Sequence, residues 1–331
     1  MYGTSVGYGA VAYSSWWHRA LLGGGFGVYL FFALSGYLLF LPFARHLFAG
    51  GRSVDPGRYA RNRALRILPL YYVVALTYLI VLHGPRFDWV VFPLFGENFF
   101  LRSVAQLDAP MWSLVDELLY YVLLPLLAAG LGWLSGRSVV RAAAVLVAAA
   151  GAAGAYRWVG YLHATQPSPL VRYNLPANFY FFLPGMLLAL AKVAWERNGD
   201  RPLPSVLGRS WLWVAGSAVL WAVVCDRYQW DLLAGPASFL LIGACVLPLR
   251  ASAPLRLLGL RPLAVLGTAS YSLYLWHLPI VTRLASAPLA GYLGHLVVEV
   301  PLTVAVALVS YRVVEEPFLR WRRRWGDTAA A

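Results

Sequence analysis

The sequence predicts an all-α fold, a polytopic transmembrane helical bundle with about nine spans. Of its 331 residues, 60% are hydrophobic and only 12% are charged, whereas charged residues make up about a quarter of a typical soluble domain. The mean hydropathy is +0.63. Apolar runs near the roughly 20 residues that cross a bilayer as a helix alternate with short connectors that contain arginine. Segments of about ten alternating residues, which would indicate a transmembrane β-barrel, are not seen.

The expected spans are residues 22–43, 66–83, 113–134, 139–156, 175–194, 211–226, 232–249, 263–282 and 293–313. Residues 89–101 are also apolar and aromatic, but Pro93, Gly96, Glu97 and Asn98 interrupt them. We expect an interfacial or re-entrant segment there. The whole chain, residues 1–331, is expected to form a single transmembrane domain, with an irregular N-terminal stretch at 1–20 and a basic tail at 315–331.

The positive charges predict the orientation of the spans. Most of the 27 lysines and arginines lie in alternate connectors and in the C-terminal tail, which the positive-inside rule assigns to the cytoplasm. The other arginines, among them Arg157 and Arg172, fall in the outside connectors. We therefore interpret the net charge of +13 as a signal of topology in a multi-pass protein of the cell membrane, and we expect no nucleic-acid partner.

Neither a metal site nor a bound cofactor is expected. The two cysteines, Cys225 and Cys245, lie in or beside apolar runs without metal-ligand spacing, and such buried cysteines mostly behave as small packing residues. The first 19 residues are too polar to span a membrane and lack the features of a signal peptide. An outside N-terminus without an export signal favours one more helix before Met1, so we expect that the chain begins late.

Four short motifs occur in order along the chain. They are FFALSGYLLF at 31–40, RNRALRILPLYY at 61–72, MWSLVDELLYY at 111–121 and SYSLYLWHLPI at 270–280. Together and with this spacing, they resemble the acyltransferase 3 family of integral membrane O-acyltransferases. The family has about ten spans, and its first helix carries a histidine roughly ten residues after a basic residue. That helix is not found here, and His18 lacks the basic partner, so we do not assign it the catalytic role.

Arg63 and Arg66 are three residues apart, so a helix presents them on one face. Planar guanidinium groups bind phosphate oxygens in a bidentate manner, and both arginines lie at the cytoplasmic end of the second expected span. The resemblance implies that this pair binds the donor, acyl-coenzyme A. The alternative is that both arginines only anchor the helix at the membrane surface.

Glu117 and His277 are the candidate catalytic residues. At 1.5 Å per residue, Glu117 lies on the order of 7 Å below the outer surface, and His277 lies roughly 20 Å across a core of about 30 Å. A carboxylate inside a span is costly unless it is paired or lines a wet cavity, and a glutamate near a histidine suits acid–base chemistry. The alternatives are a glutamate paired structurally with an Arg or Tyr and a packed histidine. Glu299 lies at a similar depth, where Pro301 equally predicts a helix distortion.

Further residues of the same motifs are expected to support the site: Trp112, Ser113, Tyr120, Tyr121, Ser270, Tyr271 and Tyr274. The tyrosines are either hydroxyl donors or members of an interfacial aromatic belt. The serines lack the context of a nucleophile elbow and are interpreted mainly as small residues at helix contacts.

The resemblance implies a membrane O-acyltransferase that moves an acyl group, above all acetyl, from acyl-coenzyme A to a hydroxyl of a sugar or glycan acceptor. Its partners would be acyl-coenzyme A, a carbohydrate or glycolipid acceptor and the lipid bilayer. A glycolipid transporter or flippase is the first alternative, but it predicts interrupted helices in symmetric positions, and only the segment near Pro93 is interrupted. A truncated, non-catalytic membrane protein is the second. Selectivity for the acceptor is expected in the loops at 84–110 and 157–173.

Overall fold

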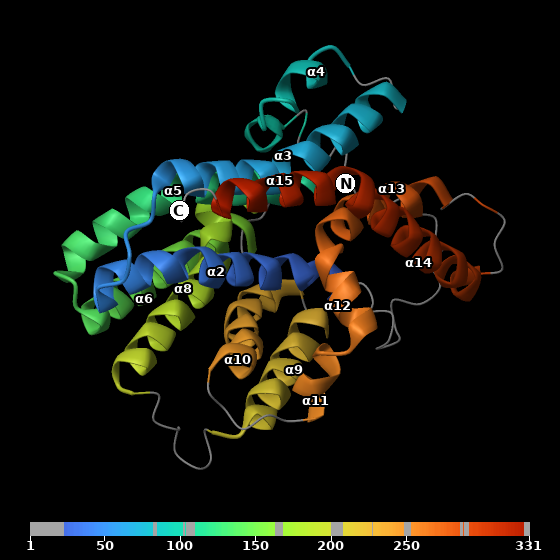
Figure 1. Cartoon of the computed structure of the whole chain (residues 1–331). Helices are drawn as coiled ribbons and strands as arrows, with labels where there is room; N and C mark the ends of the chain where they lie inside the picture. Colours follow the sequence, from blue (N-terminus) through green and yellow to red (C-terminus); the bar gives the residue numbers. More distant parts are fainter. Residues whose placement is uncertain are drawn as a thin grey trace. The chain divides into compact units, whose positions relative to one another are not determined.

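The computed structural model describes residues 23–81, 85–101, 103, 110–162, 168–199, 208–226, 228–247, 253–284, 287 and 291–327. His18 lies outside these residues. All regular elements of the described chain are helical (Figure 1). The contacts between Cα atoms divide the chain into two compact units. The described parts of unit 1 lie within 57–115 and 260–327, and those of unit 2 lie within 23–56 and 116–259.

Unit 2 is a bundle of apolar helices. Its main helices are α2 (Gly27–Ala49), α5 from Asp116 onward (Met111–Ser135 in full), α6 (Val139–Arg157), α8 (Leu175–Arg197), α9 (Ser210–Asp226) and α10 (Ala234–Val246). Shorter elements are η1 (Gly23–Phe26), the π-helix η3 (Trp158–Leu162), α7 (Pro169–Arg172), η4 (Tyr228–Leu233) and α11 (Ala253–Leu258). Helix α8 packs extensively on α2, α6 and α10 and is the centre of this unit.

Two glycines allow α2 and α8 to touch through their backbones. A Cβ atom at Gly36 would overlap the carbonyl oxygen of Phe182, and a Cβ atom at Gly185 would overlap the carbonyl oxygen of Ala33. Small residues permit this close approach between membrane helices. Gly36 belongs to the FFALSG motif, so the motif has a structural role: it brings the side chain of its neighbour Ser35 close to the bundle centre.

The start of α8 is fixed by its own sequence. The side chain of Asn174 accepts a hydrogen bond from the backbone amide of Ala177, with 2.9 Å between Oδ1 and N, as an N-cap residue does. Pro176 occupies the first turn, where its missing N–H costs nothing. The cap therefore fixes where α8 begins and with it the position of Asn178.

Unit 1 contains the remaining long helices. They are α3 (Pro56–Val81, with Pro56 in unit 2), α13 (Ser270–Leu284) and α14 (Gly291–Ser310), with the π-helix η5 (Tyr311–Glu315) and α15 (Glu316–Asp327) after α14. The interrupted segment predicted at 89–101 consists of the short helices α4 (Asp88–Val91) and η2 (Glu97–Phe99). Between them, Phe95 has a positive φ of 55°, which reverses the chain.

The predicted all-α transmembrane bundle is confirmed, and helices form most of the described residues in each of the nine expected ranges. Six helical stretches in the described chain are long and apolar enough to cross a membrane: 27–49, 56–81, 111–135, 139–162, 169–197 and 294–322. Residues 210–226 and 230–246 form shorter apolar helices. The range 263–282 is divided, because α12 (Arg261–Thr268) ends before Ala269 and α13 begins after it. The chain is a multi-pass membrane protein.

Candidate active site

Glu117 is buried in α5 of unit 2 and is held by two hydroxyl groups. Only 1% of the residue is exposed. Its Oε1 accepts a hydrogen bond from Ser35, with 2.7 Å between the oxygens, and a second from Tyr121, one turn further along α5. Ser35 comes from the motif at 31–40, so two of the four motifs meet at this carboxylate. The alternative of a structural pairing expected a tyrosine from a neighbouring helix, whereas Tyr121 belongs to α5 itself. The two hydroxyls fix the orientation of the carboxylate.

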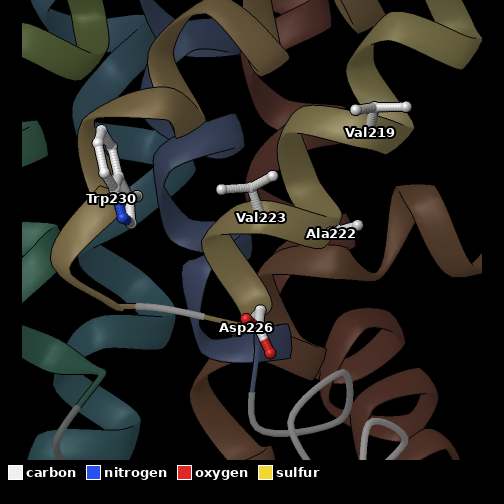
Figure 2. Close-up of a pocket in the computed structure, with 5 residues that line it drawn as sticks. All are labelled: Val219, Ala222, Val223, Asp226 and Trp230. Atoms are coloured by element: carbon white, nitrogen blue, oxygen red, sulfur yellow. The ribbon is translucent and has the colours of Figure 1, made fainter.

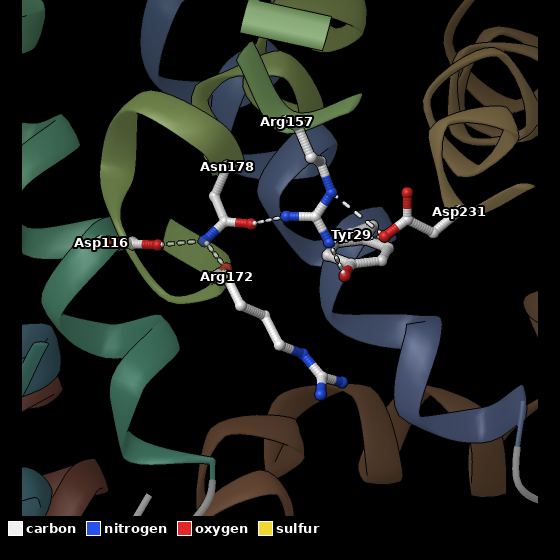
Figure 3. A network of polar contacts seen from close by, with 6 residues as sticks. All are labelled: Tyr29, Asp116, Arg157, Arg172, Asn178 and Asp231. Carbon is white, nitrogen blue, oxygen red and sulfur yellow. Dashed lines mark hydrogen bonds and ion pairs between the residues drawn. The ribbon is translucent and has the colours of Figure 1, made fainter. Parts of the chain in front are cut away.

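A buried polar network begins at the residue before Glu117. The side-chain amide of Asn178 donates to Asp116, with 2.7 Å between Nδ2 and Oδ2, and its carbonyl accepts from Arg157, with 2.9 Å between Oδ1 and NH1. Arg157 pairs with Asp231, with 2.5 Å between NH2 and Oδ2, and also donates to the hydroxyl of Tyr29. Figure 3 shows these side chains converging from five separate segments of unit 2.

Pairing makes this arginine tolerable inside an apolar bundle. Arg157 has no exposed surface, and a buried guanidinium is costly unless its charge and its N–H groups are satisfied. Asp231 supplies the charge, while Asn178 and Tyr29 accept further hydrogen bonds. The ring of Tyr29 stacks on Phe181, with 3.7 Å between centroids. The network thereby links four helices and η4 beside the Glu117 carboxylate.

The network was not predicted from the sequence. Arg157 was expected in an outside connector, whereas its guanidinium is buried at the C-terminal end of α6. Asp231, its partner, lies 74 residues away, and no periodic pattern joins two such positions. A signal was nevertheless present. Asp116 and Glu117 are adjacent acidic residues inside an apolar segment, and an intramembrane acid needs a partner.

His277 lies in α13 of unit 1, half-buried, with one ring nitrogen already engaged. Its Nδ1 lies 2.5 Å from the carbonyl oxygen of Tyr274. A carbonyl only accepts hydrogen bonds, so in the neutral ring Nδ1 carries the proton and Nε2 carries the lone pair. This is the tautomer that a general base acting through Nε2 requires. Glu117 belongs to unit 2, and His277 belongs to unit 1.

The motifs at 111–121 and 270–280 also meet within unit 1. The hydroxyls of Ser113 and Tyr274 lie 2.7 Å apart, and one of them donates to the other. The carbonyl oxygen of Pro110 lies 2.8 Å from the Ser113 hydroxyl and 3.1 Å from the Tyr274 hydroxyl, and it accepts the remaining proton. Tyr271 donates to the carbonyl of Ile67 at 2.9 Å, which ties α13 to α3. Ser113, Tyr271 and Tyr274 thus connect the helix that carries His277 to its neighbours.

The other supporting residues have different surroundings. The backbone carbonyl of Trp112 accepts from Asn98, with 2.8 Å between O and Nδ2. Tyr120 is buried and stacks on Phe182, with 4.2 Å between centroids, so it contributes mainly to packing. Ser270 is exposed at the start of α13. Glu299 contacts His295 of the same helix, with 2.8 Å between Oε1 and Nδ1.

Arg63 and Arg66 both lie in α3, on the same helix face as predicted. Both side chains are half-buried. The Glu315 carboxylate of η5 lies close enough to Arg66 for electrostatic attraction, and its Oε1 accepts from Ser272, with 2.5 Å between the oxygens. Arg66 therefore has an acidic neighbour within unit 1, and binding of the donor by this pair stays a prediction.

Each unit contains an open pocket. The pocket in unit 2 measures about 600 Å³ and is lined by Val219, Ala222, Val223, Asp226 and Trp230 (Figure 2). The pocket in unit 1 measures about 650 Å³, and Tyr78, Trp276 and Arg283 are among its lining residues. Neither pocket is lined by Glu117 or His277. No group of three His, Cys, Asp or Glu residues within the described chain is placed to hold a metal ion.

Comparison with known proteins relates the whole chain to one family. A family model described as "Acyltransferase domain" matches residues 1–312. The YrhL protein of Bacillus subtilis is 28% identical over 328 residues, which cover 89% of this chain and 50% of that protein. The peptidoglycan O-acetyltransferase OatA of Listeria monocytogenes is 24% identical, covering 89% of this chain and 51% of its own length.

The O-acetyltransferase OatA of Staphylococcus aureus is 25% identical over 325 residues, covering 90% of this chain and 53% of that protein. The chain thus spans about half the length of the curated relatives that it matches. No solved structure matches it significantly. Since the family model covers nearly all of the sequence and the four motifs lie within the matched region, the chain belongs to the acyltransferase 3 family of membrane proteins.

Proposed function

We propose that this chain transfers an acetyl group from acyl-coenzyme A to a hydroxyl group of a glycan. The observation that carries the proposal is the buried Glu117 carboxylate, which two hydroxyls from two motifs hold in a membrane helix. Family membership supports the reaction class, and the names of the OatA relatives support acetyl as the group and a glycan as the acceptor.

In the proposed reaction, Nε2 of His277 removes the proton of an acceptor hydroxyl. The hydroxyl oxygen then forms an ester bond with the carbonyl carbon of the thioester, the carbon–sulfur bond breaks, and the released thiolate of coenzyme A takes up a proton. Glu117, which Ser35 and Tyr121 orient within unit 2, is the second acid–base group of the proposal. The orientation of His277 by the Tyr274 carbonyl supports its role as the base.

The donor would enter from the cytoplasm. Arg63 and Arg66 would bind the phosphates of coenzyme A, since a guanidinium fork matches phosphate oxygens. This arrangement places the basic C-terminal tail in the cytoplasm of a cell-membrane protein and the glycan acceptor on the outer side. The distribution of lysine and arginine along the sequence supports this orientation.

The test is transfer of label from radiolabelled acetyl-coenzyme A to a glycan acceptor, measured in membranes that contain the full chain. Arg63→Ala and Arg66→Ala should raise KM for the donor, because each removes a phosphate-binding group. Arg58→Ala is the matched control, since Arg58 is exposed in the first turn of the same helix. Unchanged activity in both Arg63 and Arg66 variants would remove the donor role, and the absence of transfer by the unmodified chain would contradict the proposed function.

A further inference from the structure

An exposed arginine lies beside the buried network, at the start of the segment that leads into α8. Arg172 is the last residue of α7, and its side chain is exposed. Its guanidinium carbon lies 5.4 Å from the ring centroid of Tyr161 and 5.2 Å from that of Tyr173. These distances are typical of cation–π contacts. Arg172 and the two tyrosines form what we call the Arg172 cluster.

The backbone of the Arg172 cluster is anchored, while no carboxylate of the described residues balances its charge. The side-chain amide of Asn178 donates to the carbonyl oxygen of Arg172 at 3.1 Å, and the same amide donates to Asp116. Figure 3 shows the Arg172 side chain extending away from this network. Within the described residues, Arg172 has no carboxylate partner, in contrast to Arg157, which Asp231 neutralises. The cluster therefore presents a positioned cation.

Tyr161 adds a polar group and a second link to the network. Its ring also lies 5.3 Å from the guanidinium carbon of Arg157, so it stands between the buried and the exposed arginine. Its hydroxyl makes no hydrogen bond to another described residue. A guanidinium with unused N–H donors beside a phenol hydroxyl and half-buried aromatic rings suits a sugar that carries an anionic group.

The Arg172 cluster and Glu117 lie at the same end of unit 2. Glu117 is near the start of α5 and Asn178 near the start of α8, while Arg157 ends α6. The hydrogen bonds from Asp116 through Asn178 to the Arg172 carbonyl span the distance between them. A saccharide bound at the cluster would therefore lie at the end of unit 2 that also carries Glu117.

We infer that the Arg172 cluster is a binding subsite for an anionic saccharide, with Arg172 pairing with a carboxylate or phosphate of the sugar and Tyr161 contributing its hydroxyl. The inference rests on the proposed function for the class of ligand, a glycan acceptor. Beyond that function, the inference names Arg172 and Tyr161 as residues that select the acceptor, and it specifies that the acceptor is negatively charged. Two groups could supply this anion: a carboxylate on the glycan, or a phosphate that links the glycan to a lipid.

Equilibrium binding to the purified full chain in nanodiscs tests the subsite without any donor. The probes are a disaccharide of N-acetylglucosamine and N-acetylmuramic acid, which carries a lactyl carboxylate, the same disaccharide with that carboxylate converted to an amide, and N-acetylglucosamine 1-phosphate. The unmodified chain should bind at least one anionic probe about tenfold more tightly than the amide, since hydrogen bonds to charged groups contribute roughly 1.5–3 kcal/mol. The tighter of the two anionic probes identifies the source of the anion.

Arg172→Gln should abolish the preference for the anionic probe, and Tyr161→Phe should weaken binding severalfold. Arg197→Gln is the matched control, because Arg197 is an exposed arginine at the opposite end of α8. Thermal unfolding of each variant checks the fold. If the unmodified chain bound neither anionic probe more tightly than the amide, or if a preference for an anionic probe survived in Arg172→Gln, the inference would be overturned. Arg172-dependent binding without acetyl transfer would contradict only the proposed function, and transfer without a charge preference only the subsite.

Discussion

The side-chain amide of Asn178 bridges Asp116 and Arg157, donating to the first and accepting from the second, with heavy-atom distances of 2.7 and 2.9 Å. One amide thereby connects the carboxylate beside Glu117 to the buried cation of unit 2. Because Asn178 also donates to the carbonyl of Arg172, a single residue of α8 links Asp116, Arg157 and Arg172. The stability of the network and the activity of the site should respond to the same few substitutions.

Asp231→Ala should destabilise the protein by about 3–5 kcal/mol, because it leaves the Arg157 guanidinium buried without its counter-ion. The double variant Arg157→Met with Asp231→Leu should recover most of that loss, since an apolar pair of similar volume avoids the cost of burying charge. Thermal and denaturant unfolding in detergent measures both. A double variant no more stable than Asp231→Ala would contradict the assignment of the cost to an unpaired charge.

Glu117→Gln should retain the fold and lose activity by roughly 10²-fold or more, the usual contribution of a positioned acid–base group. The amide oxygen still accepts from Ser35 and Tyr121, so unfolding should be nearly unchanged. The rate of acetyl transfer measures the effect. Glu196→Gln is a suitable control, because its carboxylate pairs with Arg45 at a half-exposed position of α8. Equal activity in the two variants would exclude a role for Glu117 in the reaction.

Gly36→Ala should destabilise unit 2 by about 1–3 kcal/mol, since the new methyl group would overlap the carbonyl of Phe182 and force the helices apart. Gly151→Ala in α6 is the matched control, because no atom lies within 4 Å of the position that its Cβ would take. That variant should be neutral or slightly stabilising, since alanine favours the helix. The unfolding temperatures of the two variants test this prediction, and an equal effect of both substitutions would contradict it.

Glu97 predicts a dependence of stability on pH. It lies between α3 and α5, outside the spans, and burial raises the pKa of its carboxyl to about 8, against the lowering effect of a hydrogen bond from Tyr71. Between the ordinary pKa of 4.5 and 8, the folded state binds more protons than the unfolded state, so stability falls as pH rises through this range. The ionisation of Glu97 should therefore lower the unfolding temperature by several degrees when the pH is raised from 5 to 9.

Glu97→Gln removes the titrating group and keeps a hydrogen-bond acceptor for Tyr71. Its unfolding temperature should change less between pH 5 and pH 9 than that of the unmodified chain. Glu316→Gln, on the more exposed helix α15, serves as the control for a general loss of negative charge. If the pH dependence persisted in Glu97→Gln and disappeared in Glu316→Gln, the assignment to Glu97 would be wrong.

Apolar runs and their lengths were sufficient to predict the helices, because each run of hydrophobic residues must satisfy its backbone internally in lipid. The division at Ala269 was not predicted, since hydropathy does not distinguish one long helix from two short ones. Burial of Glu117 followed from the cost of a charge in a span, but its partner Ser35 lies 82 residues away. Contacts over such distances depend on how helices pack, which the periodicity of a single sequence does not encode.

The backbone contact at Gly36 and Gly185 sets the register between α2 and α8. On α2, Tyr29 lies one turn before the contact region and Ser35 lies within it, and they reach two different polar groups, Arg157 and Glu117. Sliding α2 by one helical turn, about 5.4 Å, would break both interactions at once. A substitution that loosens the contact between α2 and α8 would therefore remove the hydrogen bond from Ser35 to Glu117 without changing either residue. A loss of activity in such a variant would result from the displaced helix and not from the loss of a catalytic group.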